Sequence, residues 1–148
     1  RRHEALAIAA AQSLVCSTVF IAPEEIDEYN VNEATRRAIL RLLESSPVTP
    51  DMLLIDGTFR FALPVAARSI KYGDSRSLSI AAASVASKVR RDTLMESLDA
   101  EFPGYDLAVH KGYGTRRHLE CLATHGPSAC HRLSYAPVAQ LLGAAHAD

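Results

Sequence analysis

Residues 79–87 constrain the fold more than any other segment, because nearly all of their side chains are small. The run reads Ser-Ile-Ala-Ala-Ala-Ser-Val-Ala-Ser, and a helix over about residues 77–100 that contains it can pack closely against a sheet. Ser77 or Ser79 can cap the amino end of this helix. Upstream, residues 52–55 form a continuous apolar run, which is typical of a strand buried on both faces. The chain is therefore predicted to adopt an α/β fold.

The other expected elements follow from side-chain periodicity and from the positions of proline and glycine. Strands are predicted over residues 13–21 and 65–72, in addition to 52–55. Helices are predicted up to about residue 11, after Pro23, over residues 31–43 and over residues 115–124, with Thr115 as the cap of the last. We expect a single domain over residues 1–140, with irregular structure up to Val138 and a loose tail over residues 141–148.

Composition narrows the possible functions only moderately. The 148 residues are 48% hydrophobic, which fits one soluble domain, and no apolar run reaches the ~20 residues that cross a bilayer. The net charge is −1, but residues 68–91 hold six basic side chains against one acid. Three cysteines without a C-x₂-C pair favour a reducing cytoplasm over a disulfide framework and give no zinc spacing. Glycine signatures of nucleotide-binding loops and of serine hydrolases are also missing from the sequence.

Two aspartates are candidate site residues, because each follows a predicted strand. Asp56 ends the apolar run and Asp74 follows Gly73 after the next strand. Ligands of open α/β sheets bind outside the carboxyl ends of the strands, so a pair of carboxylates there can hold a metal ion. The alternative roles are structural: Asp56-Gly57 is a common turn pair, and Asp74 can cap the following helix.

The segment His110-Lys-Gly-Tyr-Gly-Thr115 is a candidate nucleic-acid contact. Glycines on both sides of Tyr113 permit a tight loop that presents the aromatic ring. Lys111 can neutralise a phosphate, and Tyr113 can lie against a sugar or a base. A surface turn with an incidental tyrosine is the alternative.

Eight motifs, taken together and in order, resemble bacterial ribonuclease HII over nearly the whole chain, to about Val138. They are Glu25-Ile-Asp-Glu-Tyr-Asn30, Leu54-Ile-Asp-Gly57, Lys71-Tyr-Gly-Asp74, Ser79-Ile-Ala-Ala-Ala-Ser84, Lys88-Val-Arg-Arg-Asp92, Phe102-Pro-Gly-Tyr105, His110-Lys-Gly-Tyr-Gly-Thr115, and His131-Arg132 with Ala136-Pro-Val138.

The resemblance implies a ribonuclease H-like mixed sheet flanked by helices, with a helical C-terminal part. It implies an endonuclease of DNA replication and repair that hydrolyses the RNA strand of RNA–DNA hybrids and ribonucleotides embedded in duplex DNA. The family uses Mg²⁺ or Mn²⁺ held by four carboxylates, and Asp56 and Asp74 match two of them as catalytic metal ligands. Tyr113 matches the tyrosine that packs against deoxyribose, with Lys111 and Gly112 in the same substrate-binding loop.

This sequence departs from the family pattern in one respect. The other two carboxylates of the family lie in an N-terminal Asp-Glu-x-Gly-Arg-Gly motif, which is not found in the 148 residues. We therefore expect the sheet to lack its first two strands, leaving unpaired edges. The 148 residues alone are expected to be poorly stable and inactive, and the full-length protein to be a cytoplasmic monomer.

Two alternative functions stay open at this point. The first is a non-catalytic nucleic-acid-binding remnant of such an enzyme, which upstream sequence with the Asp-Glu-x-Gly-Arg-Gly motif would disfavour. The second is a small-molecule α/β enzyme or a purely structural domain. Salt-dependent binding to an RNA–DNA duplex would count against the second, because phosphate contacts release counterions.

Overall fold

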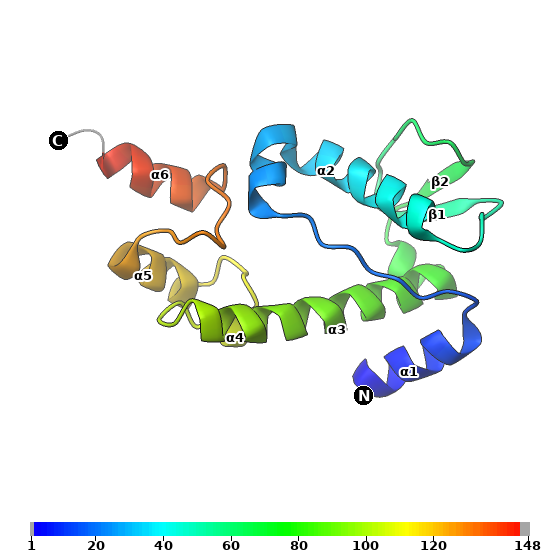
Figure 1. The fold of residues 1–148 in the computed structure, drawn as a ribbon, viewed down its shortest axis with the longest axis horizontal. Coiled ribbons are helices and arrows are strands. Elements are labelled where there is room, and N and C mark those ends of the chain that lie inside the picture. Colours follow the sequence, from blue (N-terminus) through cyan, green and yellow to red (C-terminus); the bar gives the residue numbers. More distant parts are fainter. Residues whose placement is uncertain (1, 146–148) are drawn as a thin grey trace. The chain divides into compact units, whose positions relative to one another are not determined.

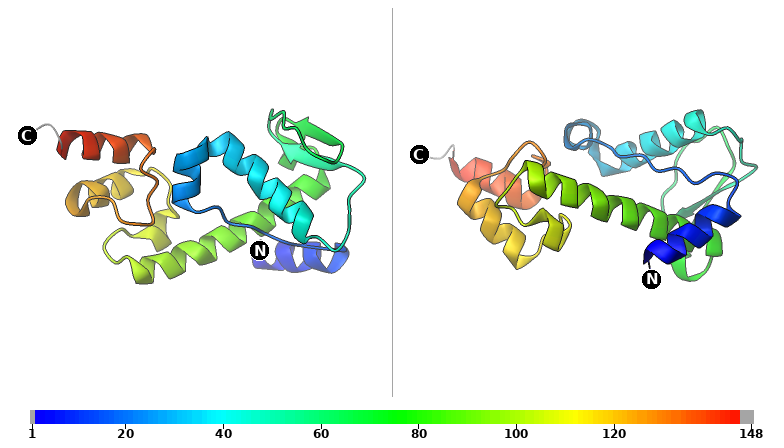
Figure 2. Two further views of the ribbon diagram at one scale, coloured as in Figure 1. Left: turned by 45° about the horizontal axis from the view of Figure 1, so that its top comes forward. Right: turned by 60° about the horizontal axis from the view of Figure 1, so that its bottom comes forward.

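The computed structural model describes residues 2–145 (Figures 1 and 2) and consists mostly of helices with one small parallel sheet. Contacts divide the chain into two compact units. The first unit comprises Arg1–Phe20 and Asn32–Arg90, and the second comprises Ile21–Val31 and Arg91–Asp148. The elements are α1 (Arg2–Gln12), α2 (Pro23–Ser45), β1 (Leu53–Asp56), β2 (Ala67–Ile70), the 3₁₀ turn η1 (Gly73–Ser75), α3 (Leu78–Glu101), α4 (Leu107–His110), α5 (Arg116–His125) and α6 (Ala136–Ala145).

The sheet of the first unit pairs β1 and β2 in parallel, with Leu53 opposite Ala67 and Asp56 opposite Ile70. β2 falls inside its predicted range, and β1 lies one residue beyond its predicted range at the carboxyl end. The expected burial on both faces of β1 is wrong, because Leu54 is 40% exposed whereas its neighbours are partly buried. This alternation is typical of a strand with one covered face, and the described residues form a sheet of only two strands.

The predicted strand over residues 13–21 is wrong, since this segment is irregular in the structure. Its β-branched and aromatic composition favours a strand only where a neighbouring strand accepts and donates the backbone hydrogen bonds. The described sheet contains β1 and β2 alone, and Leu14 is 91% exposed. Local propensity is therefore overridden by the lack of a pairing partner within residues 2–145.

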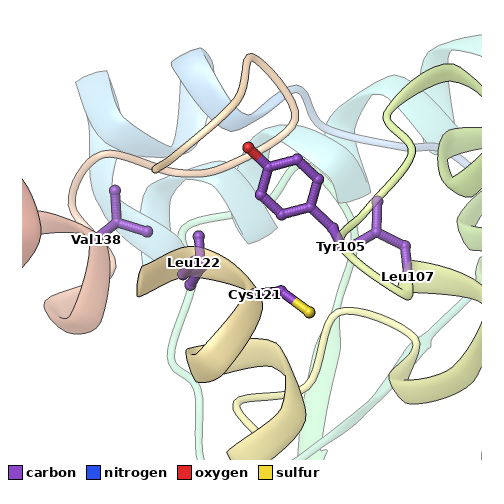
Figure 3. Close-up of a cluster of buried hydrophobic side chains, with 5 residues drawn as sticks. All are labelled: Tyr105, Leu107, Cys121, Leu122 and Val138. Atoms are coloured by element: carbon purple, nitrogen blue, oxygen red, sulfur yellow. The ribbon is translucent and has the colours of Figure 1, made fainter. Parts of the chain in front are cut away.

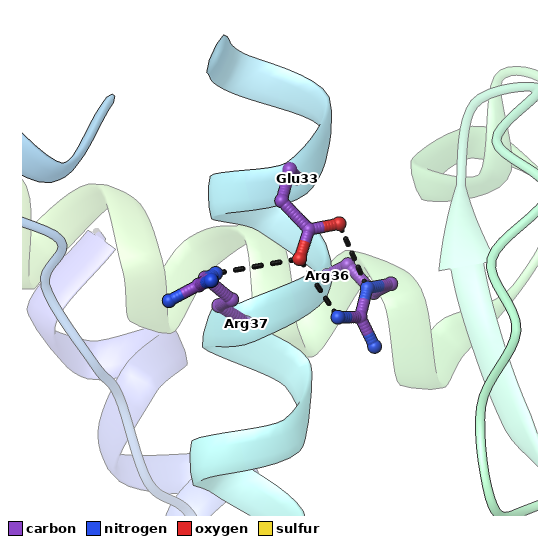
Figure 4. Close-up of polar contacts among 3 residues, drawn as sticks. All are labelled: Glu33, Arg36 and Arg37. Carbon is purple, nitrogen blue, oxygen red and sulfur yellow. Dashed lines mark hydrogen bonds and ion pairs between the residues drawn. The ribbon is translucent and has the colours of Figure 1, made fainter. Parts of the chain in front are cut away.

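Helix α2 consists of two helical segments joined by a kink at Asn30, where φ is 65° and ψ is 166°. Asparagine accepts positive φ more readily than most residues, which explains why the helix changes direction there. Beyond the kink, Arg36 donates two hydrogen bonds to Glu33, at 2.8 and 2.7 Å, and Arg37 donates a third at 3.3 Å (Figure 4). The hydrogen bonds from Arg36 lower the pKa of the Glu33 carboxyl. These ion pairs stabilise the segment of α2 that follows the kink.

Helix α3 confirms the prediction made from the small-residue run, within one residue at each end. The Ser77 hydroxyl accepts a 3.5 Å hydrogen bond from the Ile80 amide, as expected of an N-cap. The buried residues of the helix are Ile80, Ala86 and Val89. None of the helices in residues 2–145 has the length and apolar character needed to cross a membrane.

The second unit has a hydrophobic core in which α4, α5 and α6 meet. Figure 3 shows its five buried side chains, which are Tyr105, Leu107, Cys121, Leu122 and Val138. The Tyr105 hydroxyl donates a 2.8 Å hydrogen bond to the Gly126 carbonyl, which satisfies the one polar group of that ring. The cap of α5 is confirmed, because the Thr115 hydroxyl accepts from the His118 amide at 3.3 Å.

Helix α6 covers residues 141–145, which had been expected to be part of a loose tail. Leu141 and Leu142 pack against the core of the second unit, and this burial stabilises a helix that the sequence pattern did not reveal. The last three residues of the expected tail, 146–148, lie outside the described residues. The prediction of a single domain over residues 1–140 stays a prediction.

Asp27 connects the Ile21–Val31 segment to the loop before α6 through hydrogen bonds. Its carboxylate accepts hydrogen bonds from the Leu133 amide at 2.6 Å, from the Ser134 amide at 3.0 Å and from the Ser134 hydroxyl. Partial burial opposes ionisation, but the hydrogen bonds from Ser134 and Leu133 outweigh it and lower the pKa of Asp27 below 3.8. The carboxylate form is therefore the one that the fold stabilises.

We predict that Asp27→Ala destabilises the second unit by about 1 kcal/mol at pH 7, since solvent partly replaces the lost hydrogen bonds. The folded pKa is lowered, so the stabilisation is present above the unfolded pKa of about 3.8 and is lost as the pH falls through the folded pKa. Urea unfolding at pH 7 and at pH 3 measures both effects. The difference between the wild type and Asp27→Ala should shrink at pH 3; an unchanged difference would contradict the carboxylate clamp.

Candidate metal site at the carboxyl ends of the strands

Asp56 and Asp74 lie at the same edge of the parallel sheet. Asp56 is the last residue of β1, and the turn η1 that contains Asp74 follows β2 after two residues. The Asp56 Oδ1 atom accepts a 2.8 Å hydrogen bond from the amide of Gly73, the residue immediately before Asp74. Both aspartates are exposed. The fold therefore brings one carboxylate against the turn that carries the other, on the rim where parallel sheets bind ligands.

A tight turn at Gly73 makes this approach possible. Tyr72 adopts the left-handed conformation, with φ 55°, and the amides of Arg76 and Ser77 donate to the Gly73 carbonyl at 3.0 and 2.8 Å. Gly73 itself is buried, and a Cβ atom there would lie 2.6 Å from Ile80 Cδ1 and 3.2 Å from Asp56 Oδ1. A side chain at this position would displace the Asp56 carboxylate or the Ile80 side chain.

We predict that Gly73→Ala lowers the free energy of unfolding by about 1–3 kcal/mol, because the added methyl group overpacks the contact with Ile80. Urea unfolding followed by circular dichroism measures this change. Gly143→Ala is the matched control, since a Cβ atom at Gly143 meets nothing within 4 Å. The control should be neutral or slightly stabilising, as expected for alanine in a helix interior. Equal effects of the two substitutions would argue against the close packing at Gly73.

A shallow groove of the first unit runs along β1 and α3 beside Asp56. Its α3 wall is built mainly from small residues, which leave open space next to the carboxylate. The lining residues are Met52, Leu53, Leu54, Asp56, Ser79, Ile80, Ala83, Ser84 and Ser87. The Asp56 side chain is therefore reachable from outside the protein.

The two carboxylates fit Mg²⁺ or Mn²⁺ in their chemistry, because both ions prefer hard oxygen ligands. Asp56 Oδ1 is oriented by the Gly73 amide, and both side chains are accessible. Within the described part of the chain, no three residues among histidine, cysteine, aspartate and glutamate come together as a metal-binding group. Asp56 and Asp74 are therefore two candidate ligands.

The candidate nucleic-acid loop belongs to the second unit, whereas Asp56 and Asp74 belong to the first. Gly112 has φ +74°, and at Gly114 a Cβ atom would collide with the Tyr135 hydroxyl. The positive φ favours glycine at position 112, and a side chain at position 114 would have to displace the Tyr135 side chain. The Tyr113 ring between them is 50% exposed, and the Arg91 guanidinium lies 4.5 Å from its centroid.

Lys111 is held differently from what the sequence suggested. Its Nζ atom donates to Glu96 Oε1 at 2.7 Å and to the Asp92 carbonyl at 3.3 Å, and its side chain is only 18% exposed. The ammonium is therefore engaged within the protein, where it ties the loop to α3. Sequence reasoning missed Arg91, which also donates to the Lys111 carbonyl at 3.2 and 3.0 Å. The sequence shows that Arg91 belongs to a basic segment, but it does not show that Arg91 contacts Lys111, twenty residues downstream.

The structure resembles the crystal structure of ribonuclease H2 from Pyrococcus horikoshii, with a TM-score of 0.76 over 99% of this chain and 77% of that one, at 15% identity. The α/β, ribonuclease H-like fold predicted from the sequence is therefore confirmed. The sequence profile of ribonuclease HII matches residues 4–138.

The chain is also similar to individual ribonucleases HII. It is 41% identical to the one from Dichelobacter nodosus over 96% of this chain and 75% of the relative. It is 45% identical to the one from Chlamydia pneumoniae and 39% identical to the one from Bacillus cereus, covering 56% and 51% of those proteins. This chain belongs to the ribonuclease HII family. It spans about half the length of the last two relatives.

Proposed function

We propose that the chain is part of a metal-dependent endoribonuclease that hydrolyses the RNA strand of RNA–DNA hybrids and ribonucleotides embedded in duplex DNA. Such an activity would serve DNA replication and repair. The observation that carries this proposal is the 2.8 Å hydrogen bond from the Gly73 amide to Asp56 Oδ1, which places the Asp56 carboxylate against the turn that carries Asp74 in a member of the ribonuclease HII family.

The proposed roles follow from the contacts of each residue. Asp56 and Asp74 would hold Mg²⁺ or Mn²⁺, with Asp56 oriented by the Gly73 amide. A bound divalent cation supplies Lewis-acid stabilisation of the charge that builds up on the scissile phosphate. The half-exposed Tyr113 ring would pack against a sugar of the substrate. Lys111 and Gly112 would belong to the same substrate-binding loop. The hydrogen bond from Arg91 to the Lys111 carbonyl and the ion pair of Lys111 with Glu96 would hold this loop in place.

The test is a cleavage assay on a DNA duplex that carries one ribonucleotide, with Mg²⁺ or Mn²⁺. We expect the 148 residues alone to be inactive, because a two-ion site needs more carboxylates than the two proposed ligands, Asp56 and Asp74. A chimera that adds an Asp-Glu-x-Gly-Arg-Gly segment from a relative should cleave on the 5′ or 3′ side of the ribonucleotide. A chimera that folds and binds the duplex without cleaving it would overturn the proposed nuclease activity.

The second candidate function is nucleic-acid binding without catalysis. The observation that favours it is the lack of a third carboxylate, histidine or cysteine beside Asp56 and Asp74 among residues 2–145. Under this alternative, the 148-residue chain binds an RNA–DNA duplex with a salt-dependent affinity, and the chimera gains no cleavage. The same chimera therefore separates the two functions.

A further inference from the structure

Three histidines of the second unit form a buried network beside the Gly112–Tyr113 loop. His110 ends α4, His118 lies in the first turn of α5, and His131 lies in the segment before α6. Their exposed fractions are 6%, 3% and 8%. The rings of His110 and His118 are stacked with centroids 4.2 Å apart, and those of His118 and His131 are 5.4 Å apart.

Backbone amides fix the proton on His110, because an amide N–H can only donate. The Gly112 amide donates to His110 Nδ1 at 3.2 Å, so this nitrogen carries a lone pair. The proton of the neutral ring is therefore assigned to Nε2, which donates to the Tyr105 carbonyl at 2.6 Å. His110 thus accepts from the loop on one side and donates to the core on the other.

The same logic fixes the protons on the other two rings. The Ser128 amide donates to His131 Nδ1 at 3.2 Å, so His131 carries its proton on Nε2. That proton points at His118 Nε2, 3.2 Å away, which must accept it. His118 consequently carries its proton on Nδ1 and donates it to the Tyr113 carbonyl at 3.0 Å.

The network ends on the loop from two directions. His110 accepts a hydrogen bond from the Gly112 amide, and His118 donates one to the Tyr113 carbonyl. The Gly112–Tyr113 backbone is therefore held at both ends. All six ring nitrogens have a hydrogen-bond partner, which argues against a metal site at these residues. Above the loop, the guanidinium of Arg91 lies against the Tyr113 ring.

We propose that His110, His118 and His131 are positioning residues that hold the Gly112–Tyr113 backbone so that the Tyr113 ring is presented to the nucleic-acid substrate. The proposal rests on the proposed function for the role of Tyr113, but the network itself does not depend on that role. It assigns a task to three histidines to which the sequence analysis gave no individual role.

Protonation of any of the three neutral rings would place two hydrogen-bond donors opposite each other. On His118 it would sit on Nε2 opposite the Nε2–H of His131, on His131 it would oppose the Ser128 amide, and on His110 it would oppose the Gly112 amide. Burial lowers the pKa of His118 and of His131, and the neighbouring histidines lower both further. His118 and His131 are therefore neutral at pH 7 and above.

The sign of the pH dependence follows from these lowered pKa values. In the unfolded chain, His118 and His131 become protonated as the pH falls below about 6.5, whereas in the folded protein they become protonated only at lower pH. The free energy of unfolding therefore decreases as the pH falls from about 6.5 towards the lowered pKa values of the folded state. Other charged and titratable groups near these rings include Cys121 and Cys130, the Tyr105 phenol, His125, Arg91, Arg132, the Lys111–Glu96 pair and the Arg117–Asp106 pair.

The first experiment reads the tautomers directly from long-range ¹H–¹⁵N spectra of the 148-residue chain at pH 7.5. We expect the Nδ1–H form for His118, which is the less common tautomer, and the Nε2–H form for His110 and His131. An Nε2–H form or an imidazolium at His118 would overturn the network. Because this measurement needs no substrate, it judges the network even if the chain binds no nucleic acid.

The second experiment measures the affinity for a fluorescent RNA–DNA duplex with a matched pair of substitutions. His118→Asn keeps an N–H donor near the Nδ1 position, whereas His118→Gln places its amide near the Nε2 position and cannot donate to Tyr113. We expect the asparagine variant to stay close to the wild type and the glutamine variant to lose about tenfold, the scale of one lost ring-stacking contact. The exposed His125, changed to Gln, is the control that should not alter binding.

The outcomes separate the two levels of the proposal. Loss of wild-type binding on acidification from pH 7.5 to 5.5 supports the positioning role, since added positive charge alone would strengthen phosphate binding. Equal affinities of the two His118 variants, with the expected tautomers, would overturn the positioning role and leave the proposed function intact. A wild-type chain that shows the tautomers but binds no duplex at any pH would instead overturn the substrate-binding role proposed for Tyr113 and leave the histidine network intact.

Discussion

Asp74→Asn should reduce cleavage of a ribonucleotide-containing duplex by at least about a hundredfold, measured in a chimera that carries the family's Asp-Glu-x-Gly-Arg-Gly segment. Substitution of a residue that only hydrogen-bonds to a metal ligand already lowers metal affinity or activity about 10–100-fold, and loss of a ligand itself should cost at least as much. The substitution keeps the size of the side chain and removes its charge. An amide is a poorer ligand than a carboxylate for Mg²⁺ or Mn²⁺, so the ion would be held weakly or displaced. Asp56→Asn should have a similar effect, because Asp56 Oδ1 is oriented towards the Asp74 turn by the Gly73 amide.

Binding to the duplex should persist in both variants, since removing negative charge does not weaken contacts with phosphates. Asp51→Asn is the matched control, because Asp51 is an exposed carboxylate that lies just before β1. The measurements are single-turnover cleavage rates and duplex affinities for all three variants. Near-normal cleavage by Asp74→Asn, with Asp51→Asn also normal, would remove Asp74 from the metal site.

Leu122→Ala should destabilise the second unit by about 2–5 kcal/mol, because it leaves a cavity in a packed core. Leu122 lies in α5 and is 1% exposed, among the buried residues of the core shown in Figure 3. A loss of this size is a large fraction of the 5–15 kcal/mol that stabilises a typical domain. The variant is therefore expected to populate unfolded forms of this unit at 25 °C.

The control for this prediction is Leu119→Ala in the same helix. Leu119 is 39% exposed, so its truncation removes less buried apolar surface and should cost no more than about 1 kcal/mol. Urea unfolding of both variants, followed by circular dichroism, measures the difference. If the two substitutions had equal effects, the core around Leu122 would not be the main source of stability in this unit.

Several elements could be predicted because their signals are local. The small-residue run with Ser77 as cap predicted α3, and the Thr115 cap predicted the start of α5. Both capping hydroxyls accept from amides a few residues away, so the interaction is contained in a short stretch of sequence. β1 was also located from an apolar run that ends in an acid, and β2 from a predicted strand that ends at Gly73.

Elements that depend on distant partners were predicted poorly. Residues 13–21 have the composition of a strand but lack a pairing strand among the described residues, and α6 forms where Leu141 and Leu142 find the core. The same reason explains the site. Asp56 and Asp74 were candidates by their positions at strand ends, but the contact between Asp56 and the Gly73 amide depends on the parallel register of β1 and β2.

The sequence by itself determined the family, the strand-end aspartates and the glycines around Tyr113, because each is encoded within a few consecutive residues. Only the tertiary structure decided that Lys111 pairs with Glu96, that Arg91 lies over Tyr113, and that His118 points its Nδ1 proton at the Tyr113 carbonyl. These contacts join residues that are up to about twenty positions apart. Hydrogen bonds and ion pairs depend on distance and direction in space, which the order of residues along a chain does not specify.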